Sequence, residues 1–349
     1  MKILISNDSP TAHYYIRTGF AKALSFAGHD VIVWDLNKKN PYDVFDEFEP
    51  DIFVSQGYNL NDAIIECILE RPNLAVTLKC GDWSKFSDEI DLNKYPILTA
   101  SQQEINNVLK IQNNVKYVDI HYSQESADIT HEYWNSKLGI KVVGLMSAAD
   151  VFDYTNGVYN EKYKSNIIFI GGRWGYKSRT IDKYILPLVD ERDKIANVKI
   201  FGNQSWGIPE YLGYIPTEYV KHFLASSLIC PNISEPHSQD FGFDIVERPF
   251  KLLSNKCFVI SDTVASMKKV FNNEEIVFAS SPANFKELCH HYIKYPNERM
   301  VYISRGYDTV INNHTYFHRA AQFFNELAMP EESSKMLDSY KIVKEKLCL

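Results

Sequence analysis

The sequence predicts an α/β protein built from two successive, doubly wound parallel sheets. Short β-branched runs alternate with helical stretches along most of the chain. The strand runs are apolar on both faces, which is typical of buried parallel strands. The length of 349 residues suits about two domains. A polar, tyrosine-rich and turn-prone segment at residues 152–165 interrupts the pattern and is typical of a linker.

The first half opens with a β-α-β unit. We expect a strand at residues 2–6, an amphipathic helix at residues 14–26 that Gly28 ends, and a second strand at residues 30–34. Further strands are expected at residues 51–55, 74–78, 96–100, 115–120 and 141–145. These elements define a first domain over residues 1–153.

The second half repeats this alternation. Its strands are expected at residues 166–170, 198–201, 228–231, 257–261 and 276–278, and a helical tail follows from Tyr316 onward. They define a second domain over residues 154–324. Because ligands of doubly wound sheets bind beyond the carboxyl ends of the strands, we expect the functional residues there.

Composition and charge exclude several classes of protein. Hydrophobic residues make up 45% and charged residues 23%, so the chain is neither disordered nor fibrous. Lys and Arg total 37 against 44 Asp and Glu, and 37 − 44 gives the net charge of −7. A negative net charge disfavours nonspecific binding to nucleic-acid phosphates. No apolar run reaches the ~18 to 20 residues of a membrane span, so we expect no transmembrane segment and a cytoplasmic location.

The strongest single motif is a strand that ends in glycines and a basic turn. Residues 166–170 are followed by Gly171, Gly172, Arg173, Lys177 and Arg179. Glycines let backbone amides approach a ligand, and a helix N-terminus with basic side chains neutralises a diphosphate. The alternative is a tight strand-to-helix turn with solvated basic residues.

A second cluster lies at residues 239–251. Glu247, Arg248 and Lys251 stand at helical spacing, so at least two of them share one face. A carboxylate there could accept hydrogen bonds from ribose hydroxyls while the cations meet phosphate. The alternatives are an exposed salt-bridged face, and a capping role for acidic residues such as Asp240.

Taken together, these motifs resemble the CgeB-type glycosyltransferases, a spore-maturation group within the GT-B glycosyltransferases. The resemblance covers residues 166–320 and rests on the Gly171-Gly172 turn and on residues 198–202, 211–216, 247–251 and 314–320. It implies the GT-B architecture, in which two Rossmann-like doubly wound domains face a central cleft. It also implies that residues 325–349 pack back on the first domain.

A weaker similarity extends to phage DNA β-glucosyltransferases. It rests on residues 171–179, on residues 213–216, and on Asp82, which follows a strand of the first half. That resemblance implies that Asp82 is the general base that deprotonates the acceptor hydroxyl. The alternative for Asp82 is an Asx turn or a helix cap.

The resemblance implies a transferase that moves a sugar from a nucleotide-diphosphate sugar, most readily a UDP-sugar, to a hydroxyl of a glycan, a protein or a small molecule. For the diphosphate we expect Gly172, Arg173, Lys177, Arg179 and Arg248. For the nucleoside we expect Tyr214, Ile215, Pro216, Glu247 and Lys251. For the donor sugar or the acceptor we expect Asn7, Asp8, His237 and Asp240. No Asp-x-Asp motif occurs, so we expect no metal and no further cofactor.

Departures from the family pattern keep other functions open. The Glu-x7-Glu pair of retaining relatives is incomplete, because the nearest registers pair Gln239 with Glu247, or Phe243 with Lys251. Lys251 also occupies a position that is acidic in many CgeB-like proteins. A catalytically inactive nucleotide-sugar-binding module is therefore one alternative. Transfer to hydroxylated DNA bases is another. A nicotinamide-dependent oxidoreductase is disfavoured, since no Gly-x-Gly-x-x-Gly follows the first strand.

The assignment of Asp82 generates a first prediction. Asp82→Asn removes the proton acceptor but keeps the size of the side chain, so it should retain nucleotide binding and lose sugar transfer by roughly 100-fold or more. Calorimetric titration of UDP and a turnover assay measure the two properties separately. Full residual turnover would show that Asp82 is not catalytic.

Overall fold

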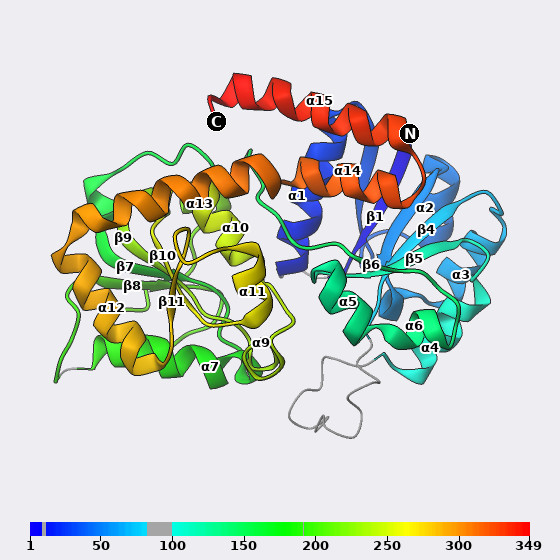
Figure 1. Ribbon diagram of the computed structural model, residues 1–349. Helices are drawn as coiled ribbons and strands as arrows, with labels where there is room; N and C mark the ends of the chain where they lie inside the picture. The colour runs from blue at the N-terminus through cyan, green and yellow to red at the C-terminus, as the bar shows by residue number, and fades with distance from the viewer. Residues whose placement is uncertain (9–11, 82–99, 191) are drawn as a thin grey trace. The chain divides into compact units, whose positions relative to one another are not determined.

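The computed structural model describes residues 1–8, 12–81, 100–190 and 192–349, which form two compact units (Figure 1). Unit 1 comprises Met1–Ser147 and Tyr316–Lys346, and unit 2 comprises Ala148–Thr315 and Leu347–Leu349. The division thus lies six residues before the boundary expected after residue 153, and the returning segment begins at Tyr316 rather than at residue 325. None of the described helices is long and apolar enough to cross a membrane.

Unit 1 is built on a parallel sheet. Its strands are β1 (Lys2–Asn7), β2 (Asp30–Asp35), β3 (Ile52–Gln56), β4 (Ala75–Lys79), β5 (Val115–Ile120) and β6 (Val142–Gly144). They are ordered β2-β1-β3-β4-β5-β6, so the chain order reverses between β1 and β3. The strand expected at residues 96–100 lies outside the described residues, apart from Ala100.

Helices cover both faces of this sheet. They are α1 (Ala12–Phe26), α2 (Pro41–Phe48), α3 (Asp62–Leu69), α4 (Gln102–Lys110), α5 (Gln124–Thr130), α6 (Glu132–Ser136), α14 (Tyr316–Glu326) and α15 (Pro330–Leu347). The side chains of α2, α3 and α4 pack on one face in a core that includes Phe45, Ile64 and Val108. α14 crosses α1 in Figure 1 and contacts it.

The returning helix α14 belongs to unit 1 because its aromatic side chains pack there. The Phe323 ring lies edge-on to Phe20 of α1, with centroids 5.4 Å apart, and to Tyr117 of β5 at 6.4 Å. Phe317 packs in the same way on Phe26 at 5.9 Å. Each such ring buries a large apolar area, so the tail is part of the core of this unit.

Unit 2 repeats the strand order of unit 1. Its strands are β7 (Ser165–Ile170), β8 (Val198–Phe201), β9 (Ser227–Asn232), β10 (Val259–Asp262) and β11 (Val277–Ala279). All of them pair in parallel in the order β11-β10-β9-β7-β8, so the chain order reverses between β7 and β9. The predicted fold class, two doubly wound parallel α/β sheets, is confirmed.

The helices of unit 2 are α7 (Gly175–Ile185), α8 (Thr217–Ala225), α9 (Pro236–Phe241), α10 (Arg248–Ser254), α11 (Ala265–Val270), α12 (Pro282–Lys294) and α13 (Arg299–Asn313). Ile181 of α7 and Phe285 of α12 are fully buried against strand residues such as Ile167 and Ile260. This core holds the carboxyl ends of β7, β9 and β10 in place beneath the loops that follow them.

Candidate functional site

Two loops flank the point where the chain order of the unit 2 sheet reverses. Gly171 and Gly172 follow β7, and Ile233 follows β9. Open α/β sheets bind ligands beyond the carboxyl ends of their strands at such a switch point. The loop after β7 leads directly into the N-terminus of α7, whose backbone amides favour an anion. This edge of the sheet is therefore the candidate site.

The guanidinium group of Arg248 joins the two loops. Its Nη1 donates a hydrogen bond to the backbone oxygen of Ile233 at 3.0 Å, and the group lies 5.1 Å from the centroid of the Phe169 ring. Its Nη2 is so near Gly171 that a Cβ atom there would lie 2.7 Å away. Burial lowers the pKa of Arg248, against the attraction of nearby carboxylates such as Glu235. Because an arginine stays protonated in proteins, a positive charge is buried at this edge.

Close backbone approach also explains the glycines at the neighbouring strand ends. A Cβ atom on Gly202, which follows β8, would clash with the backbone oxygen of Gly171. The Gly202 amide donates to the backbone oxygen of Gly213 at 2.9 Å, and Gly213 adopts a φ of 94° that favours glycine. The three glycines therefore expose bare backbone at the end of β7 and β8.

Lys177 and Glu235 form an ion pair beside Arg248. Lys177 Nζ lies 2.9 Å from Glu235 Oε1, and the two side chains are only 14% and 16% exposed. Burial raises the pKa of Glu235, but the positive charges of Lys177 and its neighbours outweigh burial and lower it overall. The Glu235 carboxylate is thus ionised and holds Lys177 in a fixed position.

His237, in the first turn of α9, is held between two partners. The Tyr176 hydroxyl accepts from the His237 backbone amide at 3.2 Å and lies 2.9 Å from its Nδ1. Asp244 Oδ2 lies 3.3 Å from Nε2 on the other side of the ring. Because a carboxylate only accepts, the Asp244 oxygen favours a proton on Nε2, and in that tautomer Nδ1 accepts from the Tyr176 hydroxyl. The ring is therefore oriented by a hydroxyl and a carboxylate.

Glu247 is the N-cap residue of α10, and one of its carboxylate oxygens receives no hydrogen bond from the described residues. Its Oε2 lies 3.4 Å from Lys251 Nζ, one helical turn on, and the side chain is 9% exposed. Among the described residues its buried Oε1 has no hydrogen-bond partner. Lys251 lies in turn over the Tyr154 ring, 4.4 Å from its centroid. A buried carboxylate oxygen without a donor is costly, so this atom is suited to a ligand hydroxyl.

A buried carboxylate beneath the site fixes the loop after β9. Asp262, the last residue of β10, accepts hydrogen bonds from the backbone amide and the hydroxyl of Ser234, each at 3.0 Å. It also accepts from Gln239 Nε2 at 2.6 Å. Burial raises the pKa of Asp262, and these hydrogen bonds oppose that shift. Both its oxygens are used within the protein, so Asp262 orients the loop.

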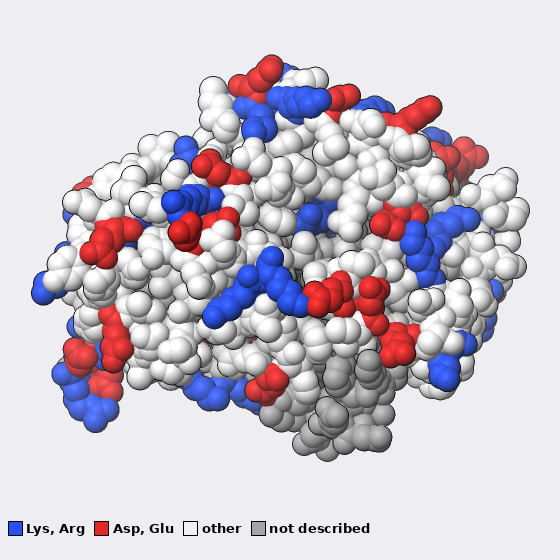
Figure 2. Space-filling view, in the orientation of Figure 1, with Lys and Arg blue, Asp and Glu red and all other residues white. Residues whose placement is uncertain are grey.

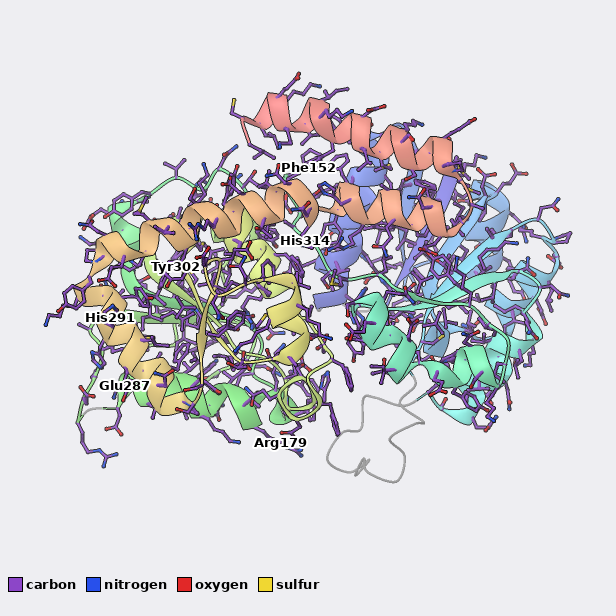
Figure 3. All side chains as sticks on the ribbon, in the orientation of Figure 1. Phe152, Arg179, Glu287, His291, Tyr302 and His314 are labelled. Atoms are coloured by element: carbon purple, nitrogen blue, oxygen red, sulfur yellow. The ribbon has the colours of Figure 1, made fainter. Side chains whose placement is uncertain are left out.

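Arg173 differs from the expectation for a ligand-binding cation. Its Nε and Nη2 donate to the two oxygens of Asp182 at 2.8 and 2.7 Å, and its guanidinium lies 5.0 Å from the Trp206 ring centroid. The bond with Asp182 raises the pKa of Arg173. Its charge is thus balanced within the protein. Arg179, labelled in Figure 3, is exposed on α7 and lies 5.5 Å from the Tyr176 ring centroid.

The remaining predicted residues fall in three places. Tyr214 is 61% exposed, Ile215 is buried and Pro216 caps α8, so these three form a turn beside Gly213. Asp240 is exposed on α9. Asn7 ends β1 and Asp8 follows it, so both belong to unit 1, and Asp82 lies outside the described residues.

Four residues of this site have no role in the sequence-based prediction: Tyr176, Glu235, Asp244 and Asp262. Glu235 and Asp262 each come at or just after the end of a strand, and that position is the signal that could have identified them. Asp244 shows no such signal, because its contact with His237 depends on how α9 turns back.

Comparison with known proteins supports the fold. Residues 179–325 match the family model described as glycosyl transferase-like. No curated protein matches the chain by sequence. Because the matched family is described only in these terms, the narrower CgeB-type resemblance stays a prediction.

Solved structures match nearly the whole chain. The sucrose-phosphate synthase of Thermosynechococcus elongatus gives a TM-score of 0.63 at 9% identity, over 93% of this chain and 98% of that one. An α-glucosyltransferase solved with UDP and DNA gives 0.65 at 12% identity, over 94% and 99%. T4 phage BGT, solved with UDP and Mn²⁺, gives 0.55 at 13% identity, over 100% of both chains. The fold is that of the GT-B glycosyltransferases.

No group of three His, Cys, Asp or Glu side chains that could hold a metal ion occurs within residues 1–8, 12–81, 100–190 and 192–349. The acidic groups of the site are instead engaged by Lys177, Lys251 and the Ser234 loop. At this edge the described residues therefore provide cations, backbone amides and a carboxylate oxygen that can accept a hydrogen bond from a ligand hydroxyl.

The packing of the glycines generates a second prediction. Gly202→Ala forces a Cβ atom against the Gly171 backbone, which cannot yield without moving β7, so it should destabilise the protein by about 1–3 kcal/mol. Gly175→Ala is the matched control, since a Cβ atom there meets nothing within 4 Å. Denaturant unfolding measures both. Equal stability of the two variants would contradict the close approach.

Proposed function

We propose that this protein is a glycosyltransferase that takes its sugar from a UDP-sugar bound to unit 2. The observation that carries the proposal is the buried Oε1 of Glu247, which has no partner among the described residues and lies beside Lys251. A nucleoside ribose supplies the hydroxyl donors that such an oxygen requires. The GT-B fold, the match of residues 179–325 to a glycosyl transferase-like family, and neighbours solved with UDP or UDP-glucose support it.

The diphosphate of the donor has a natural place between the loops after β7 and β9. There the backbone amide of Gly172, the N-terminus of α7 and the charge of Arg248 favour an anion. Lys177 adds a second cation, which Glu235 positions. Asp182 holds Arg173 in position in the same way, and we keep Arg173 as a further cation of the loop after β7. We assign Arg179, exposed on the same helix, to the outer side of the diphosphate.

The nucleoside lies, in this proposal, along the turn after Gly213. Tyr214 offers an exposed ring for stacking, and the backbone of Ile215 and Pro216 offers hydrogen-bonding groups to a base. Glu247 receives the ribose hydroxyls. His237, held by Tyr176 and Asp244, lies in the first turn of α9 and is assigned to the donor sugar, as is Asp240 on the same helix.

In the transfer, the bond between the anomeric carbon and the β-phosphate oxygen breaks, and that oxygen leaves with the electron pair on UDP. The acceptor oxygen forms the new bond to the anomeric carbon, and its proton passes to a base. Negative charge grows on the leaving diphosphate, so the preorganised charges of Arg248 and Lys177 stabilise the transition state. The sequence assigns the base to Asp82, and Asn7 and Asp8 to the acceptor or sugar; these remain proposals.

For the acceptor we propose a hydroxyl of a glycan, a protein or a small molecule. Two observations disfavour transfer to hydroxylated DNA bases: the net charge of −7, and the mixing of Lys and Arg with Asp and Glu on the face displayed in Figure 2. Structural neighbours described as DNA-modifying or solved with DNA share the fold at 10–14% identity, which says nothing of the acceptor here. Retention on DNA that falls steeply with salt would reverse this preference.

The role of Glu247 generates a third prediction. Glu247→Gln keeps the shape but removes the charge that a ribose hydroxyl would bond, so UDP affinity should fall roughly tenfold or more. Calorimetric titration with UDP measures the loss, and release of UDP from UDP-glucose measures turnover. A Glu247→Gln variant that binds UDP as tightly as the wild type would contradict the assignment.

The matched control is Glu287→Gln, because Glu287 is exposed on α12 and is labelled in Figure 3 away from the loops after β7 and β9. This variant should bind UDP with unchanged affinity. UDP binding without any release from a panel of UDP-sugars, with acceptors present, would instead support the inactive binding module.

A further inference from the structure

Two buried amide side chains lie side by side at the carboxyl edge of the unit 1 sheet. Asn7 ends β1 and Gln56 ends β3, and the chain order of this sheet reverses between these two strands. The parallel register places Ile5 beside Val54, and the hydroxyl oxygens of the next pair, Ser6 and Ser55, lie 2.7 Å apart. One residue further along, Asn7 therefore lies beside Gln56.

Both amides lie on the sheet face that α1 covers. Alternate residues of a strand share a face, so Asn7 shares its face with Ile5, and Gln56 shares its face with Val54. Ile5 and Val54 line a cavity together with α1 residues such as Arg17. The opposite face belongs to the core of α2, α3 and α4.

These amides have hydrogen-bonding capacity that the described residues do not use. Gln56 is fully buried, and neither its Oε1 nor its Nε2 has a hydrogen-bond partner among them. Asn7 is 7% exposed, and its Oδ1 lacks a partner in the same part of the chain. A buried amide without partners costs free energy, which a ligand that supplies those partners recovers.

The charged groups around the two amides compensate one another. Arg17 of α1 is attracted by the carboxylates of Asp8 and Asp119. Lys79, which pairs with Gln56 in the parallel register, in turn attracts Asp119. Two cations thus face two carboxylates among these residues. The unmet capacity at this edge is that of the neutral amides, so the ligand that fits it is uncharged.

Tyr58, in the short helix after β3, borders the amides. Its hydroxyl lies near Asp8 and on the donor side of Gln56, although the approach to Gln56 falls short of hydrogen-bond geometry. Desolvation and the charge of Asp8 raise the pKa of Tyr58, so the hydroxyl stays protonated. More than half of the Tyr58 side chain is exposed, which leaves an apolar ring beside the amides for a ligand to pack against.

An apolar recess adjoins the same edge. The cavity that Ile5 and Val54 line measures about 60 Å³, lies between the sheet and the helices α1 and α14, and includes Phe20 and Phe323 in its wall. It has room for a few water molecules or for a group of a few heavy atoms. Amides beside apolar surface match a molecule that bears both hydroxyl and C–H groups.

We infer that the carboxyl edge of the unit 1 sheet binds an uncharged, hydroxyl-rich molecule, a sugar or the end of a glycan, through the amides of Asn7 and Gln56. A hydroxyl both donates and accepts, so it bonds an amide oxygen as a donor and Gln56 Nε2 as an acceptor. Because neighbouring strands lie ~4.8 Å apart, one molecule with several hydroxyls reaches both amides.

This binding site rests on residues of unit 1 alone and stands independently of the nucleotide-sugar site. Its connection with transfer rests on the proposed function: a sugar held here would be the acceptor, which narrows the proposed acceptors to carbohydrates.

The test titrates the full chain with three neutral probes, the methyl glycosides of glucose, galactose and mannose, and follows the probes by NMR. Gln56→Leu keeps the approximate size of the side chain but removes both amide atoms, so probe affinity should fall about tenfold or more. Asn7→Leu should weaken binding by roughly threefold to tenfold. Failure of all three probes to bind the wild-type protein overturns the proposal, as does unchanged affinity in Gln56→Leu.

The matched control is Gln112→Leu. Gln112 is exposed and precedes β5, so it lies at the opposite, amino edge of the sheet. This variant should bind the probes as the wild type does. An equal loss of affinity in Gln112→Leu and Gln56→Leu would contradict a site at the carboxyl edge.

Thermal unfolding separates a ligand-binding amide from a structural one. Leucine in place of a buried amide without partners removes a desolvation penalty, so Gln56→Leu should melt at the same temperature as the wild type or higher. A lower Tm would assign the Gln56 amide to the fold and overturn its role in binding.

Ionic strength and probe charge provide a further signature. An uncharged ligand has no Coulomb attraction for salt to screen, so its affinity should stay within about twofold between about 20 and 500 mM NaCl. Glucuronate, which bears a carboxylate where glucose has a hydroxymethyl group, should bind no more tightly than methyl glucoside. Tighter binding of glucuronate that falls with salt would overturn the proposal.

Glu247→Gln distinguishes this edge from the site in unit 2. That variant should bind the neutral probes with unchanged affinity, and a loss there but not in Gln56→Leu would place the sugar in unit 2 and overturn the proposal. Should UDP fail to bind the wild-type protein, the nucleotide-sugar proposal fails, whereas the Gln56→Leu titration still decides the sugar site.

Discussion

The buried guanidinium of Arg248 is the contact on which the site in unit 2 depends. It spans the switch point of the sheet by bonding the backbone after β9 and packing against the backbone after β7. A Cβ atom at position 171 would lie 2.7 Å from its Nη2, so any larger residue there would displace the guanidinium. Because the group is charged and buried, its surroundings must supply compensating carboxylates, and the ionised Glu235 is one of them. Lys177 then follows as the partner of that carboxylate, so the arrangement of cations is set by one residue.

The two units use the same strand order with different chemistry. In unit 2 the polar groups are at the open edge of the sheet, among glycines that expose backbone. In unit 1 the sheet residue Lys79 and the helix residues Arg17 and Arg319 line a largely apolar cavity between the sheet and the helices α1 and α14. Similar topology therefore leaves the chemistry to a few side chains.

Much of the fold could be predicted from the sequence, because buried parallel strands give continuous β-branched runs. The strands at residues 166–170 and 198–201, for example, match β7 and β8 to within one residue. The boundary between the units was harder to predict from the sequence, because it depends on the tertiary contacts of Phe323 with Phe20 and Tyr117. In the candidate site, the sequence indicated which loops matter but not which cations are already paired. Arg173 and Arg248 are the same residue type in the sequence. Only the structure shows that Arg173 pairs with the Asp182 carboxylate, whereas Arg248 bonds the backbone oxygen of Ile233.

The return of Tyr316–Lys346 to unit 1 has a consequence for synthesis of the chain. Unit 2 is almost continuous in sequence, so its residues leave the ribosome together and can fold while synthesis proceeds. The core of unit 1 includes Phe323, which packs against Tyr117 some two hundred residues earlier. The core of unit 1 is therefore complete only after Phe323 has been synthesised. A contact of such long sequence separation also slows folding. The apolar surface of the N-terminal half that α14 covers is therefore exposed in the nascent chain until the last helices emerge.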